Sequence, residues 1–270
     1  MAITIIILFI LYVFLFLYSL KIKDNSIVDV FWGFGFMIIA VLSFFIGGMM
    51  DIPQITVTLL VLLWWIRLTS HIWFRKLREW KEDPRYAKWR EEWGSGWYFI
   101  VRSFFQVYMF QMVLMLVVAV PIIIVNENLK FYPYDFYPVS SEIGDGLAVY
   151  LLIFIIWGLF ALSGLVFEMI ADIQLKAFLK IKKPGQIFTT WLYRYSRHPN
   201  YFGESMFWLG VSIMSLPFSY LGIIGWITIT CLLLFVSGVP LQEARYEGRP
   251  EWEEYKKKTS VFVPWFVKRK

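Results

Sequence analysis

The chain has 270 residues, of which 59% are hydrophobic and only 17% are charged. Soluble domains are about 45–50% apolar and about 25% charged, so the composition excludes a soluble protein and predicts an integral membrane protein. Its net charge of +6 does not indicate a nucleic-acid partner, because the basic residues are distributed between apolar runs. A single cysteine, Cys231, excludes an intrachain disulfide, and two histidines argue against a histidine-rich metal site.

Apolar runs predict seven membrane spans in a single multi-pass domain over residues 1–270. Each spanning helix needs roughly 20 apolar residues. The first run has neither the basic start nor the small-residue cleavage site of a signal peptide, so it is interpreted as a span. We therefore expect an all-α integral membrane helix bundle of about seven transmembrane helices. The predicted spans are 2–20, 29–50, 54–74, 103–125, 146–168, 204–217 and 220–239.

The positions of the basic residues predict the orientation of these spans. With seven alternating spans every basic loop falls on one face, and of 26 lysines and arginines only Lys130 lies on the other side. The positive-inside rule makes the basic face cytoplasmic, with the N-terminus outside and the C-terminus inside. The acidic loop 126–145 then faces outward. The expected location is a bacterial inner membrane, or the endoplasmic reticulum membrane in a eukaryote, and the oligomeric state is left open.

Residues 196–204 read SRHPNYFGE and concentrate polar side chains where an apolar run begins. Ionisable groups at a membrane boundary are costly, so they point to function. Pro199 suits the first turn of a helix, because it has no N–H to leave unpaired. Asn200 and Glu204 would then share one helix face. The alternative is a helix cap with interfacial anchors. A cap needs one polar residue, whereas this stretch has five, namely Ser196, Arg197, His198, Asn200 and Glu204.

Arg197 and His198 precede this predicted helix, beside the free N–H groups of its first turn. That arrangement is a ready site for a phosphate or carboxylate. On the third predicted span, Arg67 and His71 are four residues apart. A buried Arg67 would face the interior of the bundle. The alternative is that the Arg67 side chain extends to the lipid headgroups. Asp172 belongs to a charged stripe with four-residue spacing, which indicates either a polar pocket or i,i+4 ion pairs on a solvated helix.

Several chemistries have no support in the sequence. There is no G-x-S-x-G elbow, no Walker loop and no soluble-type dinucleotide fingerprint. Any nucleotide would have to be bound by arginine, tyrosine, asparagine and carboxylate side chains. Near the C-terminus, Tyr255 precedes three consecutive lysines, and the apolar stretch 261–265 is typical of a tail that docks on the membrane surface.

Six sequence blocks in order resemble the bacterial DUF1295 proteins, within the superfamily that shares the C-terminal domain of steroid 5α-reductases. The resemblance covers most of the chain. Its blocks are NSIVDVFWG (25–33), WIRLTSHIWFR (65–75), EDPRY (82–86), ADIQL (171–175), YSRHPNYFGE (195–204) and TSVFVP (259–264).

The resemblance implies a multi-span helix bundle that holds NADPH in a cavity open to the cytoplasmic face. In steroid and sterol reductases, hydride passes to a carbon–carbon double bond of a lipid. The related isoprenylcysteine and phospholipid methyltransferases carry a similar RHPxYxxE arrangement but bind S-adenosylmethionine. The expected cofactor is therefore NADPH, with S-adenosylmethionine as the alternative.

Several cofactor-binding residues follow from the resemblance. Asn200 and Glu204 match the Asn-x-x-x-Glu of the reductases, which looks like a clamp for the nicotinamide carboxamide. Asp172 matches the aspartate that helps to hold the cofactor. Arg67 and His71 are similar to the Arg-x-x-x-Tyr of the equivalent reductase span, with histidine in place of tyrosine. Arg197 and His198 match the methyltransferase form better than the form of the steroid enzymes. With Tyr255, they complete the expected cofactor-binding set.

The catalytic residues depart from the steroid enzymes. Those enzymes activate the substrate carbonyl with a glutamate in span two and a tyrosine in span three, whereas this chain has Asp29 and Trp64 near those positions. A developing enolate needs a hydrogen-bond donor. Asp29 could donate only if burial keeps it protonated, and Tyr201 is a second candidate. Glu204 is expected to contribute to catalysis as well as to binding.

The leading hypothesis is an NADPH-dependent reductase acting on a double bond of a membrane lipid, such as a steroid, isoprenoid or fatty enone. The first alternative is an S-adenosylmethionine-dependent lipid or isoprenoid methyltransferase. The second is a non-catalytic lipid-binding membrane protein, which would not need a buried cluster of Arg, Asn and Glu. The bilayer and a lipid substrate are the expected partners.

The predicted orientation can be tested by cysteine-accessibility labelling in a Cys231→Ser background. A cysteine placed at position 135 should react only with reagent added outside, and one at position 257 only with reagent that reaches the cytoplasm. Labelling of position 135 from the cytoplasmic side, or of position 257 from outside, would overturn the topology.

Overall fold

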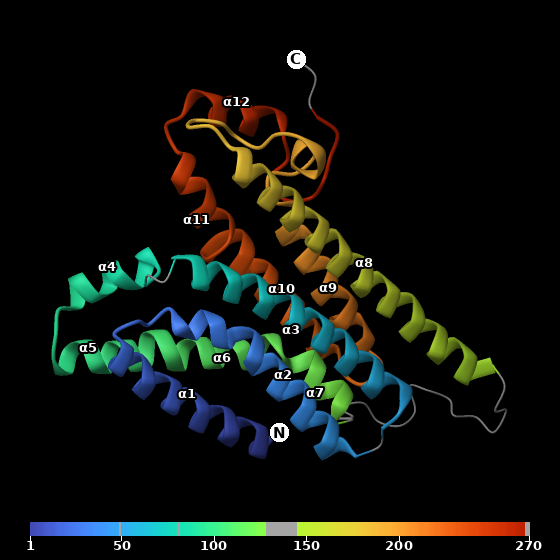
Figure 1. The fold of residues 1–270 in the computed structure, drawn as a ribbon. Coiled ribbons are helices and arrows are strands. Elements are labelled where there is room, and N and C mark those ends of the chain that lie inside the picture. The colour runs from blue at the N-terminus through green and yellow to red at the C-terminus, as the bar shows by residue number, and fades with distance from the viewer. Residues whose placement is uncertain (49, 80–81, 128–144, 268–270) are drawn as a thin grey trace. The chain divides into compact units, whose positions relative to one another are not determined.

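The computed structural model describes residues 1–48, 50–79, 82–127 and 145–267, and these residues form helices and connecting turns (Figure 1). The all-α fold class is confirmed. The predicted outward loop 126–145 lies almost entirely outside the described residues.

Among the described residues, six helical segments are long and apolar enough to cross a membrane, so the chain is an integral multi-pass membrane protein. They coincide with six of the seven predicted spans. The remaining prediction, 204–217, falls in a helix of 17 residues that begins at Pro199, as its sequence predicted, and this span stays a prediction. The six segments are Ala2–Ile22, Ile27–Gly47, Ile52–Trp73, Trp97–Val118, Phe154–Ile181 and Tyr220–Tyr246.

Two of the predicted bounds were wrong for identifiable reasons. The span predicted at 103–125 begins earlier, at Trp97. Its helix stops at Val118, because Pro121 in the first turn of the next helix cannot donate a backbone hydrogen bond. The helix of the span predicted at 146–168 continues to Ile181. Its added turns carry charged residues at four-residue spacing, which favours a helix that is polar along one face.

The chain divides into two compact units, which are described separately. The N-terminal unit contains residues 1–140 and 215–222, and the C-terminal unit contains residues 141–214 and 223–270. The expectation of one domain over residues 1–270 stays an expectation.

The N-terminal unit is built around buried aromatic side chains. Phe36 meets Trp64 edge to face with ring centroids 5.2 Å apart, and Tyr12 meets Phe31 in the same way at 5.3 Å. Trp64 is therefore a core residue. The elements are α1 (Ala2–Ile22), α2 (Ile27–Gly47), α3 (Ile52–Glu79), α4 (Pro84–Trp93), α5 (Trp97–Arg102), a π-helical segment (Ser103–Met109), α6 (Phe110–Val118), α7 (Val120–Asn126) and a 3₁₀ turn (Tyr220–Gly222).

A buried asparagine at the end of α7 ties three helices of this unit together. Asn126 Nδ2 donates to the Ala40 carbonyl oxygen at 2.9 Å and lies 3.0 Å from Ser43 Oγ and 3.1 Å from Thr58 Oγ1. The backbone carbonyl of Asn126 accepts a hydrogen bond from Gln54 Nε2 at 2.5 Å. The buried amide thus satisfies its hydrogen bonds within the protein, as a low-dielectric setting requires.

The C-terminal unit depends on the close packing of α8 against α9, which lie side by side (Figure 1). A Cβ on Gly203 would lie 2.6 Å from the backbone nitrogen of Glu168, and one on Gly164 would lie 2.6 Å from that of Phe207. Small residues let helix backbones approach in this way. The elements are α8 (Asp145–Ile181), a 3₁₀ turn (Trp191–Arg194), α9 (Pro199–Ser215), α10 (Ile223–Cys231), a π-helical segment (Leu232–Val236), α11 (Val239–Glu243), a second 3₁₀ turn (Ala244–Tyr246) and α12 (Pro250–Lys258).

The Gly203→Ala substitution should destabilise the protein by about 1–3 kcal/mol, because the added methyl meets backbone atoms that cannot rotate away. Thermal unfolding in detergent, followed by tryptophan fluorescence, measures the effect. Ser163→Ala, on an exposed position of the same helix pair, is the control and should leave the unfolding temperature unchanged. An unchanged unfolding temperature for Gly203→Ala would contradict the close α8–α9 contact.

Candidate functional site

The α8–α9 contact brings an amide and several carboxyl groups together in the C-terminal unit. Asn200 Nδ2 donates to Asp172 Oδ1 at 3.4 Å, so these two predicted cofactor-binding residues do meet. Glu168 and Glu204 occupy neighbouring turns of the two helices and are only 2% and 9% exposed. The group, which we term the amide–carboxylate cluster, combines one amide donor with acceptors and can form hydrogen bonds to a ligand that has both donors and acceptors.

Arg197 and His198 share one carboxylate that the sequence analysis did not select. Arg197 Nε lies 2.9 Å and His198 Nε2 3.1 Å from Glu243 Oε1. The Arg197 side chain is 11% exposed, and its Nη1 also donates to the carbonyl oxygens of Lys256 and Thr259 at 3.2 and 3.3 Å. This Arg–His–Glu cluster joins the start of α9 to α11 and to the end of α12.

The pairing with Glu243 lowers the attraction of Arg197 and His198 for an anion. Both were expected to lie near cofactor phosphates, yet the charge of Arg197 is offset by Glu243. A signal for Glu243 was present in the sequence, since it is a carboxylate at the end of an apolar run, where a buried charge needs a partner. Tyr201, a predicted catalytic residue, stacks on the His198 ring with centroids 5.5 Å apart.

The C-terminal tail is held against the polar motif by hydrogen bonds. Arg197 N donates to the Ser260 carbonyl at 2.8 Å, and Ser196 Oγ donates to the Phe262 carbonyl at 2.7 Å. Phe262 is buried while Val263 and Trp265 are exposed, so the tail presents an apolar outer face. That face matches the predicted docking on the membrane surface, which stays a prediction.

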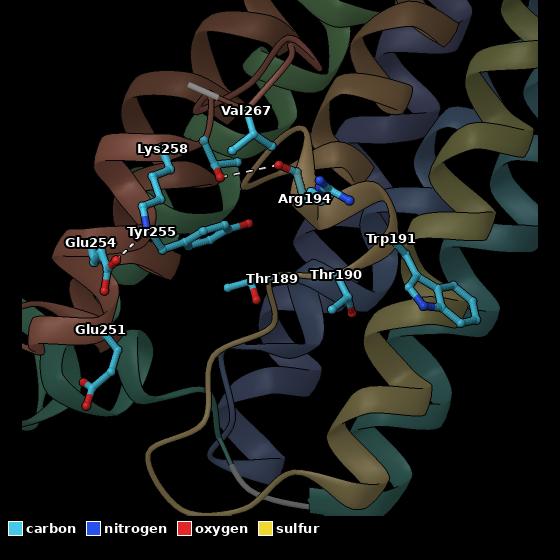
Figure 2. Close-up of a pocket in the computed structure, with 10 residues that line it drawn as sticks. Thr189, Thr190, Trp191, Arg194, Glu251, Glu254, Tyr255, Lys258 and Val267 are labelled. Carbon is cyan, nitrogen blue, oxygen red and sulfur yellow. Dashed lines mark hydrogen bonds and ion pairs between the residues drawn. The ribbon is translucent and has the colours of Figure 1, made fainter. Parts of the chain in front are cut away.

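A pocket of about 660 Å³ lies in the C-terminal unit (Figure 2). Tyr255, a predicted cofactor-binding residue, forms part of its wall, and its hydroxyl donates to the Tyr193 carbonyl. Burial raises the pKa of Tyr255 above its usual range, so the hydroxyl stays protonated. The lining residues are Thr189, Thr190, Trp191, Arg194, Glu251, Glu254, Tyr255, Lys258, Thr259 and Val267.

Asp29 lies in a polar cluster of the N-terminal unit. Its two carboxylate oxygens accept hydrogen bonds from Tyr86 Oη at 2.7 Å and from Arg85 Nη2 at 2.9 Å. Gln111 Nε2 donates to the same tyrosine hydroxyl at 2.9 Å. Burial and the charge of Asp29 hold the pKa of Tyr86 well above its usual range. The hydrogen-bonding proton of this pair therefore belongs to Tyr86.

The sequence blocks 25–33 and 82–86 meet around this cluster. Glu82 accepts from the backbone N–H of Asn25 at 2.8 Å and from two nitrogens of Arg90 at 2.8 and 3.0 Å. The Glu82–Asn25 contact is not visible in the sequence, because the two residues are 57 positions apart, whereas Glu82 and Arg90 are only eight apart. Tyr86 could have been found only as part of the EDPRY block.

Arg67 and His71 lie on α3, in the N-terminal unit. Arg67 is half-buried and His71 is exposed. Their predicted contribution to cofactor binding stays a prediction.

The family of the chain follows from comparison of its sequence. Residues 15–259 match the profile of the family described as "Protein of unknown function (DUF1295)". The chain belongs to the DUF1295 family. No curated protein and no solved structure matches it. The amide–carboxylate cluster, the Arg–His–Glu cluster and the Asp29 cluster of this DUF1295 protein all lie within the matched residues.

The Glu243→Ala substitution should destabilise this DUF1295 protein by about 3 kcal/mol, because it leaves a largely buried arginine without its carboxylate. Thermal or denaturant unfolding in detergent measures the loss. Glu253→Ala removes the partner of Lys256 in an exposed pair and should change stability by less than about 1 kcal/mol. Equal effects of the two substitutions would show that the Arg–His–Glu cluster does not stabilise the unit.

Proposed function

We propose that this DUF1295 protein is an NADPH-dependent reductase that transfers a hydride to a carbon–carbon double bond of a membrane lipid of the steroid, isoprenoid or fatty enone class. The observation that supports it most is the Asn200–Asp172 contact inside the amide–carboxylate cluster. Membership of the family adds support through its resemblance to sterol reductases.

The amide–carboxylate cluster fits the nicotinamide carboxamide by its donor and acceptor set. A carboxamide has two N–H donors and one carbonyl acceptor. Glu204 would accept from the amide nitrogen of the ligand, and Asn200 would pair with its carboxamide. Asp172 fixes the Asn200 side chain by accepting from its Nδ2, which orients that amide before a ligand arrives.

The remaining predicted residues would bind the rest of the cofactor. Arg67 and His71 are assigned to it by their match to the reductase motif. Arg197 and His198 would sit near the phosphates, with Glu243 fixing their positions. Tyr255 would contribute through the pocket wall. In our proposal the cofactor site opens to the cytoplasmic face, in agreement with the predicted orientation.

NADPH supplies the hydride when bound, and the protein must supply a hydrogen-bond donor for the charge that develops on the substrate. We assign this role to Tyr201, which stacks on the His198 ring in the same unit as the amide–carboxylate cluster. Tyr201→Phe should lower turnover while cofactor affinity is retained, because it removes the hydroxyl and keeps the ring.

One observation favours the methyltransferase alternative. Glu243 offsets the positive charge of Arg197, and this lowers the attraction of the motif for phosphate. S-adenosylmethionine has no phosphate and would not need that charge. Comparison of the two cofactors on one protein preparation therefore belongs in every test of the reductase proposal.

Asn200→Ala and Glu204→Gln should each weaken NADPH binding about tenfold or more, which corresponds to about 1.4 kcal/mol. The first removes a hydrogen bond to the carboxamide, and the second replaces a charged acceptor by a neutral, weaker one. Titration of the detergent-purified protein, followed by tryptophan quenching or calorimetry, gives the affinities. Glu247→Gln changes an exposed carboxylate and is the control. Wild-type binding of NADPH with unchanged affinity in both variants would refute the clamp, and micromolar S-adenosylmethionine binding with none for NADPH would refute the reductase.

A further inference from the structure

The pocket of Figure 2 has one wall made by the segment 189–194, which the proposed reductase site does not use. Thr189 and Thr190 place two exposed hydroxyl groups beside the open space, and Arg194 lies on the same segment. The pocket volume of about 660 Å³ falls within the range typical of small-molecule sites.

This segment has an unusual backbone that is held on two sides. Trp191 has a φ of 60°, a left-handed conformation that bulky side chains rarely adopt, and its side chain is exposed at the pocket rim. Leu192 N donates to Gln174 Oε1 of α8 at 3.1 Å, and Thr259 Oγ1 donates to the Arg194 carbonyl at 3.4 Å. Strain that the surroundings maintain in this way is characteristic of ligand-binding segments.

The two basic side chains of the pocket wall differ in whether a carboxylate pairs with them. Lys258 is paired with Glu254 on the α12 wall. Arg194 lies 6.0 Å from the centroid of the Tyr195 ring, and within the described part of the chain no ion pair joins it to a carboxylate. It contrasts with Arg197, whose charge Glu243 offsets. The pocket therefore presents the guanidinium of Arg194 beside two hydroxyl groups. Together these side chains can donate hydrogen bonds to a phosphate.

The opposite wall suits a nucleoside. Glu251 lines it and accepts hydrogen bonds, so it can receive an exocyclic amine or a ribose hydroxyl. An anion would be repelled from this wall, which confines a phosphate to the Arg194 side. A ligand with an amine or hydroxyl at one end and a phosphate at the other satisfies both walls.

We propose that this pocket binds the phosphorylated adenosine end of NADPH and that Arg194, with Thr189 and Thr190, makes the protein select NADPH over NADH. The inference rests on the proposed function, because it concerns the cofactor of that reductase. The 2′-phosphate is the only group that distinguishes the two nucleotides, so its contacts determine the selectivity.

The test is a set of binding titrations on the full detergent-purified chain with NADPH, NADH and adenosine 2′,5′-bisphosphate. Arg194→Gln should lower the affinities for NADPH and for the bisphosphate about tenfold or more, and leave the affinity for NADH unchanged. Thr189→Val and Thr190→Val should lower the same two affinities by smaller factors. Arg245→Gln removes an exposed arginine outside the pocket and is the matched control.

The outcomes separate the two proposals. NADPH binding by the wild type with an unchanged NADPH-to-NADH ratio in Arg194→Gln overturns the selectivity pocket and leaves the reductase proposal standing. If Arg194→Gln lowers the affinities for NADPH and NADH equally, the selectivity pocket is also overturned, because Arg194 then does not contact the 2′-phosphate specifically. No binding of NADPH or NADH by the wild type overturns the reductase proposal and this inference with it.

Discussion

Charge that is removed from water at the ends of apolar helices must be paired, because the desolvation of each unpaired ion costs several kcal/mol. Three ion pairs of this protein follow that constraint. In the N-terminal unit, Asp29 is paired with Arg85, and Glu82 is paired with Arg90. In the C-terminal unit, Glu243 is paired with Arg197. Two of these pairs, Asp29–Arg85 and Arg197–Glu243, join residues that lie far apart along the chain, and the helix packing places them within hydrogen-bond distance.

The same constraint distinguishes structural from ligand-binding charge. Arg197 donates to a carboxylate and to two backbone carbonyls, so most of its hydrogen-bonding capacity holds α9, α11 and α12 together. Arg194, three residues earlier, is exposed at a pocket. In one short stretch of this DUF1295 protein, Arg197 thus stabilises the fold, whereas Arg194 is accessible to a ligand.

The sequence predicted features that depend on local patterns. Apolar run length gave six spans that the structure contains, and Pro199 marked the start of α9. Pairings between distant segments could not be predicted. Glu243 and Tyr86 owe their roles to partners that folding brings close, and no local pattern in the sequence identifies those partners.

The nucleotide that co-purifies with the protein tests the central claim most directly. The full chain would be extracted in mild detergent, separated from free nucleotides and denatured, and the released small molecules would be identified by mass spectrometry. A cofactor site of the reductase type predicts stoichiometric NADP⁺ or NADPH. Release of S-adenosylmethionine or S-adenosylhomocysteine in its place would contradict the account and assign the protein to the methyltransferase class.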